Sequence, residues 1–151
     1  MSIRWMYPED FDEVVAIDEC GGGVADKRQL HECLSIPGVK GVVWCSPQII
    51  RGFTLYQVRP KSIALFYMMV GVNDRRAGIG REFVSWVKII GSSMGLNVKV
   101  QVRESDTASQ LFFKSQGFTA YKVKRRFFHD TGEDAYLFRY VTTTKKVQVK
   151  V

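Results

Sequence analysis

The segment from Ile63 to Arg81 constrains the fold of this chain most, because a nearly uninterrupted apolar run leads directly into a glycine-containing turn. Residues 63–72 read IALFYMMVGV and contain no charged side chain. Such a run is typical of a central strand whose two faces are both covered. It is much shorter than the ~20 residues that a membrane-spanning helix needs. The sequence therefore predicts a buried strand that ends in a turn and is followed by a helix.

The helix after this turn is the clearest one in the sequence. Its apolar residues recur at steps of four, four, three and four, which places them in one stripe on a helix surface. These residues are Ile79, Phe83, Val87, Ile90 and Met94. Gly95 follows at a position where a glycine commonly ends a helix. The spacing therefore predicts a helix over residues 79–94 with one buried face.

The turn between the strand and the helix has the features of an anion-binding site. Amides that open a helix have no intrahelical acceptor, and the helix dipole adds positive potential there. Gly78 and Gly80 would let a phosphate approach the backbone closely. Arginine side chains, which can give two donors to a phosphate, surround the glycines: Arg75, Arg76 and Arg81. The alternative is that the two glycines only permit a tight turn.

Two familiar nucleotide-binding loops do not fit this turn. A P-loop needs Gly-Lys followed by Ser or Thr, which is missing here. The dinucleotide-binding fingerprint needs a third glycine, and Phe83 occupies that position when the pattern starts at Gly78.

The rest of the chain alternates between strand and helix patterns. Strands are predicted at residues 3–6, 39–45, 52–58, 98–103, 118–128 and 135–141. Pro8 opens a first helix, Asp26 is predicted to cap a second, and Asp106 or Ser105 is predicted to cap the last. In the last helix we expect Ala108, Leu111 and Phe112 to face inward. This order indicates one α/β or α+β domain with a mixed sheet, spanning residues 1–144, and a basic tail at residues 145–151.

Composition narrows the classes of function. The net charge of +7 would attract a nucleic acid, an anionic membrane or a phosphorylated cofactor, but no aromatic-basic RNA-recognition signature is present. The three cysteines lack CxxC spacing, so we expect buried free thiols rather than a zinc site or disulfides. The N-terminus lacks the apolar run of a secretion signal. We therefore expect a soluble, cytoplasmic protein without a bound metal.

The pattern Arg75-x-x-Gly78-x-Gly80 resembles the pyrophosphate-binding signature of the GNAT acyltransferases. Three further strings resemble that superfamily in the same order: VRESD at residues 102–106, LFFKSQGF at 111–118 and GEDA at 132–135. The similarity is strongest to ribosomal-protein-alanine and other protein N-terminal acetyltransferases. It implies a mixed, mostly antiparallel sheet of about seven strands flanked by four helices, with acetyl-CoA as co-substrate.

The resemblance also implies which residues bind acetyl-CoA. Backbone groups of Met68, Met69 and Val70 would bind the pantetheine arm. The pyrophosphate would lie on the turn formed by Arg75, Arg76, Ala77, Gly78, Ile79, Gly80 and Arg81. Residues of the next helix would contact the cofactor as well: Asp106, Ser109 and Phe113.

In the resembling enzymes, a Glu or His on the fifth strand often acts as the base, and a Tyr on the next helix protonates the leaving thiolate. Gln101 and Phe113 occupy these two positions, and neither side chain titrates. Glu19, Glu104 and Tyr67 are candidate substitutes. The acceptor would lie against Phe127, Phe128 and Tyr136.

Three hypotheses of function follow. The first is transfer of an acetyl group to a primary amine within a ternary complex, with a protein N-terminus as the acceptor or, alternatively, a small amine. The second is a CoA-binding regulatory module with impaired catalysis, which the residues Gln101 and Phe113 motivate. The third is a basic RNA-binding protein. We expect no membrane partner, and a nucleic acid only through a ribosomal substrate.

Overall fold

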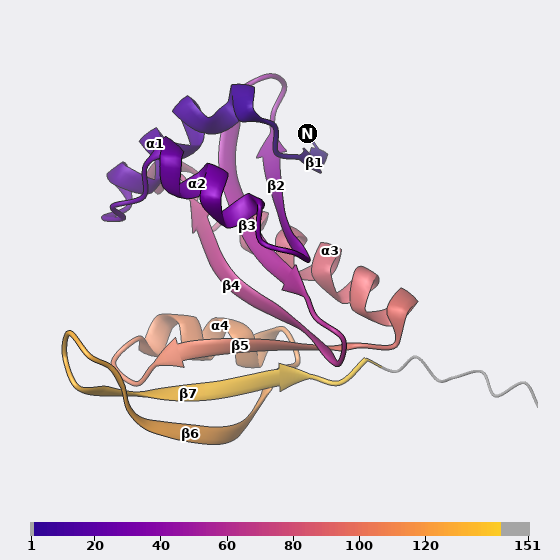
Figure 1. The fold of residues 1–151 in the computed structure, drawn as a ribbon, viewed down its shortest axis with the longest axis vertical. Helices are drawn as coiled ribbons and strands as arrows, with labels where there is room; N and C mark the ends of the chain where they lie inside the picture. The colour runs from indigo at the N-terminus through magenta and orange to yellow at the C-terminus, as the bar shows by residue number, and fades with distance from the viewer. Residues whose placement is uncertain (1, 143–151) are drawn as a thin grey trace, which may run out of the picture. The chain divides into compact units, whose positions relative to one another are not determined.

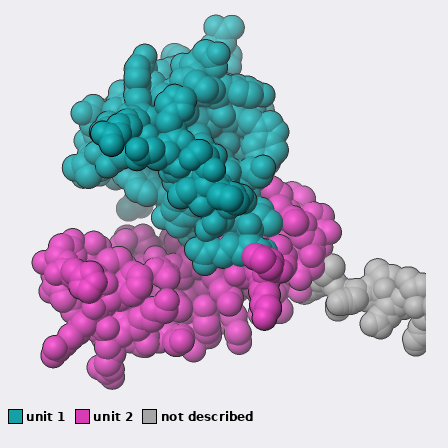
Figure 2. Space-filling model, in the orientation of Figure 1, with its two compact units in different colours: residues 1–59, 65–86 teal, residues 60–64, 87–151 magenta. Residues whose placement is uncertain are grey.

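The computed structural model describes residues 2–142, so the predicted basic tail at residues 145–151 lies outside the described part. The chain forms two compact units (Figure 2). The first contains the residues up to Arg59 together with Leu65–Trp86. The second contains Pro60–Ala64 together with the residues from Val87 onward.

Seven strands form one sheet in the order β1-β2-β3-β4-β5-β7-β6 (Figure 1). The strands are β1 (Ser2–Trp5), β2 (Val39–Cys45), β3 (Ile50–Val58), β4 (Ser62–Val70), β5 (Asn97–Arg103), β6 (Thr119–Phe128) and β7 (Glu133–Tyr140). Within the described residues, the α-helices are α1 (Phe11–Cys20), α2 (Lys27–Leu34), α3 (Ile79–Met94) and α4 (Thr107–Ser115). Short 3-10 helices span Pro8–Asp10 and Val72–Asp74. The predicted mixed sheet of about seven strands with four helices is confirmed.

The strand pairings are antiparallel between β1 and β2, β2 and β3, β5 and β7, and β6 and β7. β4 pairs with β5 in parallel, over Ser62–Ala64 and Asn97–Lys99. β4 is shorter than its apolar run suggested, because Gly71 leaves the strand and Val72 begins a 3-10 helix. Phe66 on β4 is 45% exposed, so the expectation that both faces of this strand are fully covered is wrong at that residue.

In the first unit, helices cover both faces of the sheet. α1 and α2 lie on one face (Figure 1). They pack there on side chains of β2 and β3. That core consists of Met6, Phe11, Val14, Leu30, Val43, Cys45, Ile50, Phe53 and Leu55. The first turns of α3 lie on the other face, where Glu82 accepts a hydrogen bond from the Trp44 indole at 3.1 Å.

Gly52 on β3 allows α3 to approach this face closely. A Cβ atom on Gly52 would lie 3.2 Å from the Phe83 ring, 3.3 Å from Ile79 and 3.1 Å from the Met69 carbonyl oxygen. Such distances are tighter than ordinary van der Waals contacts. The absence of a side chain at this position therefore helps to place the start of α3.

In the second unit, β5, β7 and β6 share a core with α4 and the later part of α3. Its buried side chains include Val87, Val98, Val100, Val102, Phe118 and Phe138. Two details of the predicted helix faces are wrong. On α4, Ala108 is exposed and Leu111 is 62% exposed, while Phe112 and Phe113 are half-buried, so the inner face of this helix is rotated toward Phe113. Met94 is also exposed, because it lies at the last residue of α3.

Candidate functional site

The turn that follows β4 is tied to β3 at its first residues. The Gly71 N–H donates to the Arg51 carbonyl at 2.8 Å, and the Asp74 N–H donates to the Gly71 carbonyl at 2.8 Å. The Arg51 guanidinium in turn forms an ion pair with Asp74 at 3.0 Å. The entrance of the turn is therefore fixed by backbone and side-chain bonds before the glycines are reached.

Two left-handed residues then lead into α3. Arg76 has φ 68° and Gly78 has φ 86°. A left-handed conformation is costly for a residue with a side chain, so Arg76 carries local strain while Gly78 does not. Gly78 accepts the hydrogen bond of Glu82 N–H at 3.1 Å, so the amides of Ile79, Gly80 and Arg81 precede the first helical bond. These amides and the helix dipole are the groups on which the predicted anion site depends.

The three predicted arginines of this turn differ in what they contact. The Arg75 Nε donates to the Val70 carbonyl at 3.1 Å, and its Nη2 lies 3.6 Å from Met69 Sδ, so its guanidinium folds back over the end of β4. Arg76 and Arg81 have exposed side chains. The positive charge of the turn therefore comes from one arginine held at the strand and two that reach into solvent.

The end of β4 presents apolar side chains on both of its faces. Met69 points toward α1, because a Cβ on Gly21 at the end of that helix would lie 2.4 Å from its sulfur. Strand alternation directs Phe66, Met68 and Val70 to the opposite face. Met68, Met69 and Val70, the predicted pantetheine contacts, are all half-buried.

Tyr67 is the one catalytic candidate that the structure pairs with a buried charge. Its hydroxyl donates to the Asp18 carboxylate of α1, and its ring stacks on Phe53 with a centroid distance of 5.6 Å. Burial, and then the hydrogen bond to Asp18, raise the pKa of the Tyr67 phenol well above its ordinary value. Asp18 is fully buried and was missed in the sequence, whereas the neighbouring candidate Glu19 is exposed.

The other candidates lie in the second unit. Gln101 on β5 is exposed. Phe113 on α4 is half-buried and packs edge-on against Phe118, with ring centroids 5.2 Å apart. The predicted N-cap is confirmed, because the Asp106 carboxylate accepts the Ser109 N–H at 3.0 Å. The amide of Ser109 is thus already bonded within α4.

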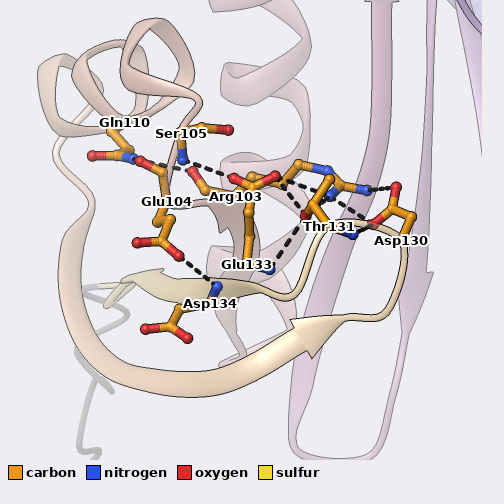
Figure 3. A network of polar contacts seen from close by, with 8 residues as sticks. All are labelled: Arg103, Glu104, Ser105, Gln110, Asp130, Thr131, Glu133 and Asp134. Atoms are coloured by element: carbon orange, nitrogen blue, oxygen red, sulfur yellow. Dashed lines mark hydrogen bonds and ion pairs between the residues drawn. The ribbon is translucent and has the colours of Figure 1, made fainter.

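Glu104 belongs to a polar network that joins the end of β5 to the β6–β7 hairpin (Figure 3). Its carboxylate accepts the Asp134 N–H at 2.8 Å, so this candidate base serves a structural bond here. Asp134 in turn accepts the Arg126 N–H at 2.8 Å, at a residue of β6 that has φ 50°. The network therefore stabilises an irregular strand next to the predicted acceptor residues.

Arg103 is the centre of this network (Figure 3). Its two terminal nitrogens contact the Asp130 carboxylate at 3.0 and 3.1 Å, and Nη1 lies 3.3 Å from Glu133. The Arg103 hydrogen bond holds the pKa of Asp130 below its ordinary value. Hydrogen bonds from Ser105 and Thr131, with a smaller contribution from Arg103, lower the pKa of Glu133.

The predicted acceptor residues occupy different environments around this hairpin. Phe128 lies under the Arg103 guanidinium, which is 4.0 Å from the ring centroid. Phe127 is 38% exposed, and Tyr136 is half-buried on β7 opposite Val102 and Val123. Phe127 therefore remains accessible, while Phe128 is covered by the guanidinium.

Comparison of the sequence with protein-family models and with curated proteins gives no match. Solved structures do match. The ribosomal-protein-S18-alanine N-acetyltransferase of Escherichia coli is 17% identical, with a TM-score of 0.85 over 99% of both chains. Naa20 of Chaetomium thermophilum, solved with a bisubstrate analogue, is 18% identical, with a TM-score of 0.82 over 95% of this chain and 88% of that one.

A nourseothricin acetyltransferase is 14% identical, with a TM-score of 0.75 over 93% of this chain and 98% of that one. The protein therefore has the fold of the GNAT acetyltransferases, as the motif at Arg75–Gly80 predicted. At these identities the likeness defines the fold.

Other site types find little support in residues 2–142. No helix there has the length and apolar character to cross a membrane. No group of three or more His, Cys, Asp or Glu side chains in that range could hold a metal ion. Cys20 is exposed, Cys33 is half-buried and Cys45 is buried, so the expectation of buried thiols is wrong for Cys20.

Proposed function

We propose that this protein is an acetyl-CoA-dependent N-acetyltransferase that acetylates a primary amine, with a protein N-terminus as the acceptor. One observation carries the proposal: a turn with left-handed Arg76 and Gly78 opens α3 directly after β4, in a chain with the fold of acetyltransferases. The free amides at Ile79–Arg81 suit a pyrophosphate, since they combine donors with the positive end of a 16-residue helix.

The apolar end of β4 suits the pantetheine arm of the same substrate. Met68 and Val70 lie beyond Ser62–Ala64, the residues that pair with β5. Backbone N–H groups in this part of β4 would polarise the thioester carbonyl, whose oxygen becomes negative as the amine adds. The exposed Phe66 ring would be covered by the arm, which explains an apolar side chain at that position.

Transfer within a ternary complex needs no covalent intermediate on the protein. The neutral amine attacks the thioester carbonyl, an N–C bond forms and the C–S bond breaks. The electron pair leaves on the sulfur of CoA. Gln101 and Phe113, at the positions where the resembling enzymes carry a base and an acid, have no side-chain group that exchanges a proton with the substrate. Proton transfer must therefore involve other groups.

Gln101 and Phe113 also support a second candidate function, a CoA-binding module that transfers acetyl groups poorly. Such a module would bind CoA at the turn but would form no acetylated product. A small amine remains the alternative acceptor. An acetyltransferase for nourseothricin shares the fold, so the fold itself accommodates acceptors of either kind.

The test is mass spectrometry of a pool of peptides and small amines incubated with the protein and acetyl-CoA. We expect a product heavier by one acetyl group and its loss in Gly78→Glu, whose carboxylate would repel the pyrophosphate. Gly95→Glu is the matched control, because Gly95 also has positive φ (69° against 86°) and also has open space where a Cβ atom would lie, but it is at the other end of α3. CoA binding without any product would favour the regulatory module.

A further inference from the structure

The Asp18 carboxylate is buried, and its hydrogen-bond partners are uncharged groups. Asp10 and Asp18 are the buried carboxylates among the described residues. Asp10 is neutralised by Arg4, whose guanidinium lies 2.8 Å away. Asp18 accepts hydrogen bonds from the Ala25 N–H, at 3.0 Å, and from the Tyr67 hydroxyl, and no ion pair within residues 2–142 includes it. Burying a carboxylate without a nearby cation costs folding free energy. We therefore expect Asp18 to have a function beyond stabilising the fold.

The connection between α1 and α2 is built around this carboxylate. The Gly23 N–H donates to the Asp18 carbonyl at 2.8 Å. A Cβ atom on Gly23 would lie 2.2 Å from Asp18 Oδ2, so this position has no room for a side chain. The connection therefore wraps the carboxylate and shields it from water, leaving Tyr67 as the polar side chain that reaches it.

Tyr67 is held rigidly in the position that meets Asp18. Its ring stacks on Phe53 at an interplanar angle of 16°, and its backbone carbonyl accepts the Thr54 hydroxyl at 2.6 Å. Since its own proton points to Asp18, the lone pairs of the phenol oxygen remain available to accept a hydrogen bond. The side chain is half-buried, and it directly precedes Met68–Val70 on β4.

We infer that Tyr67 and Asp18 form the proton-accepting site for an acceptor that arrives as a cationic ammonium group; this inference rests on the proposed function. The ammonium donates to the Tyr67 oxygen. One proton passes from nitrogen to that oxygen while the phenol proton passes to the Asp18 carboxylate, which neutralises the buried charge. Tyr67 contacts the substrate, and Asp18 acts through it.

The remaining steps balance the reaction. The neutral amine attacks the thioester, the N–C bond forms and the C–S bond breaks. The second proton leaves the nitrogen for the departing sulfur, which gives CoA as a thiol. Asp18 then returns its proton through Tyr67 to solvent. The site thus supplies the titrating group that Gln101 and Phe113 lack.

The acceptor that depends on Tyr67 and Asp18 is a strongly basic amine. At pH 7 about one α-amine in seven is neutral, whereas only about one lysine-type alkylamine in 2,500 is neutral. An amine that is already neutral needs no proton acceptor before attack. Loss of the pair must therefore harm a strongly basic amine far more than a weakly basic one of the same size.

The experiment compares ethylamine, which is an ammonium ion at pH 7, with trifluoroethylamine, which is neutral there. Both are used at saturating acetyl-CoA with the wild type, Tyr67→Phe and Asp18→Asn. We expect kcat/KM for ethylamine to fall about 100-fold in both variants. For trifluoroethylamine we expect less than about a five-fold fall, and CoA affinity should stay within about two-fold of the wild type.

Thr54→Val is the structural control, because it removes a hydrogen bond to the Tyr67 backbone and leaves both members of the pair in place. It should lower the rates of both amines by the same factor. Equal losses for the two amines in Tyr67→Phe, or no loss for ethylamine, would overturn the inference and leave the proposed function standing. If the wild type binds CoA but acetylates neither amine nor any member of the pool of peptides and small amines, the proposed function fails and the inference fails with it; acetylation of a peptide but of neither simple amine would overturn the inference alone.

Discussion

The Arg51 guanidinium on β3 forms an ion pair with Asp74 at 3.0 Å, and this pair ties the 3-10 helix after β4 to the sheet. Both side chains are partly exposed, so the pair contributes about 1 kcal/mol or less. Its position gives it a second effect, since Asp74 lies directly before the arginines of the turn. The pair thereby limits the motion of a turn that has to be ordered when a pyrophosphate binds.

We predict that Asp74→Asn raises the KM for acetyl-CoA by about two- to five-fold and changes kcat little. The turn would still form, but it would be more mobile in the free protein. Ordering it on binding would then reduce the net free energy of acetyl-CoA binding. Steady-state kinetics with varied acetyl-CoA measures this effect. Arg28→Met is a suitable control, because it removes a surface pair with Glu32 on α2. An unchanged KM in Asp74→Asn would mean that the turn is ordered without the pair.

Arg76 combines positive charge with a strained backbone, and two substitutions separate these properties. Arg76→Ala and Arg76→Gly both remove the guanidinium, but only glycine relieves the left-handed conformation at φ 68°. We predict that the glycine variant is more stable than the alanine variant by about 1 kcal/mol in urea unfolding. CoA affinity should fall about equally in both. Equal stabilities would show that the left-handed conformation costs little at this position.

Gly52 should tolerate no side chain without a loss of stability. In Gly52→Ala the new methyl group would meet Phe83 and the Met69 carbonyl at 3.2 and 3.1 Å, so we predict a loss of about 1–3 kcal/mol. Phe83→Leu should cost stability on its own by leaving a cavity. The double variant should lose less than the sum of the single losses, because the smaller leucine makes room for the methyl group. Additive losses would mean that the clash lies with the backbone of β4.

Asp10 gives the stability of the protein an acid-side pH dependence. The hydrogen bond from Arg4 lowers the pKa of the Asp10 carboxyl, against an opposing effect of burial. A carboxylate with a lowered folded-state pKa stabilises the fold above its unfolded-state pKa of about 4, and this stabilisation is lost as pH falls through the folded-state value. Asp10→Asn should therefore be less stable than the wild type at pH 7, and the difference should shrink below pH 4. Urea unfolding at both pH values checks the sign, and a constant difference would contradict it.

Local patterns in the sequence predicted the elements that depend on neighbouring residues. The strand at Val39–Cys45 and the helix at Ile79–Met94 have the predicted bounds, because apolar patterns define them locally, with the Pro37-Gly38 turn before the strand and Gly95 after the helix. Asp26 and Asp106 cap α2 and α4 as predicted, since an N-cap bond spans only three residues. The turn at Arg75–Arg81 is predictable for the same reason.

The sequence could not predict contacts that depend on register across the sheet. Asp18 and Tyr67 are 49 residues apart, and nothing in the pattern of α1 distinguishes Asp18 from exposed Glu19. The left-handed residue Arg126 arises where β6 slips against β7 between Lys124 and Phe128, which no local motif signals. The prediction for Leu111 is wrong because the helical period fits more than one face when aromatic residues stand side by side.

The central claim is that the turn opening α3 binds the pyrophosphate of acetyl-CoA, and calorimetric titration tests it most directly. CoA and pantetheine, which carries neither phosphate of the pyrophosphate, would be titrated into the wild type, Gly78→Glu and the control Gly95→Glu. We predict that Gly78→Glu weakens CoA binding at least about tenfold and changes pantetheine binding little, and that the control resembles the wild type. Equal CoA affinity in all three proteins would contradict the claim.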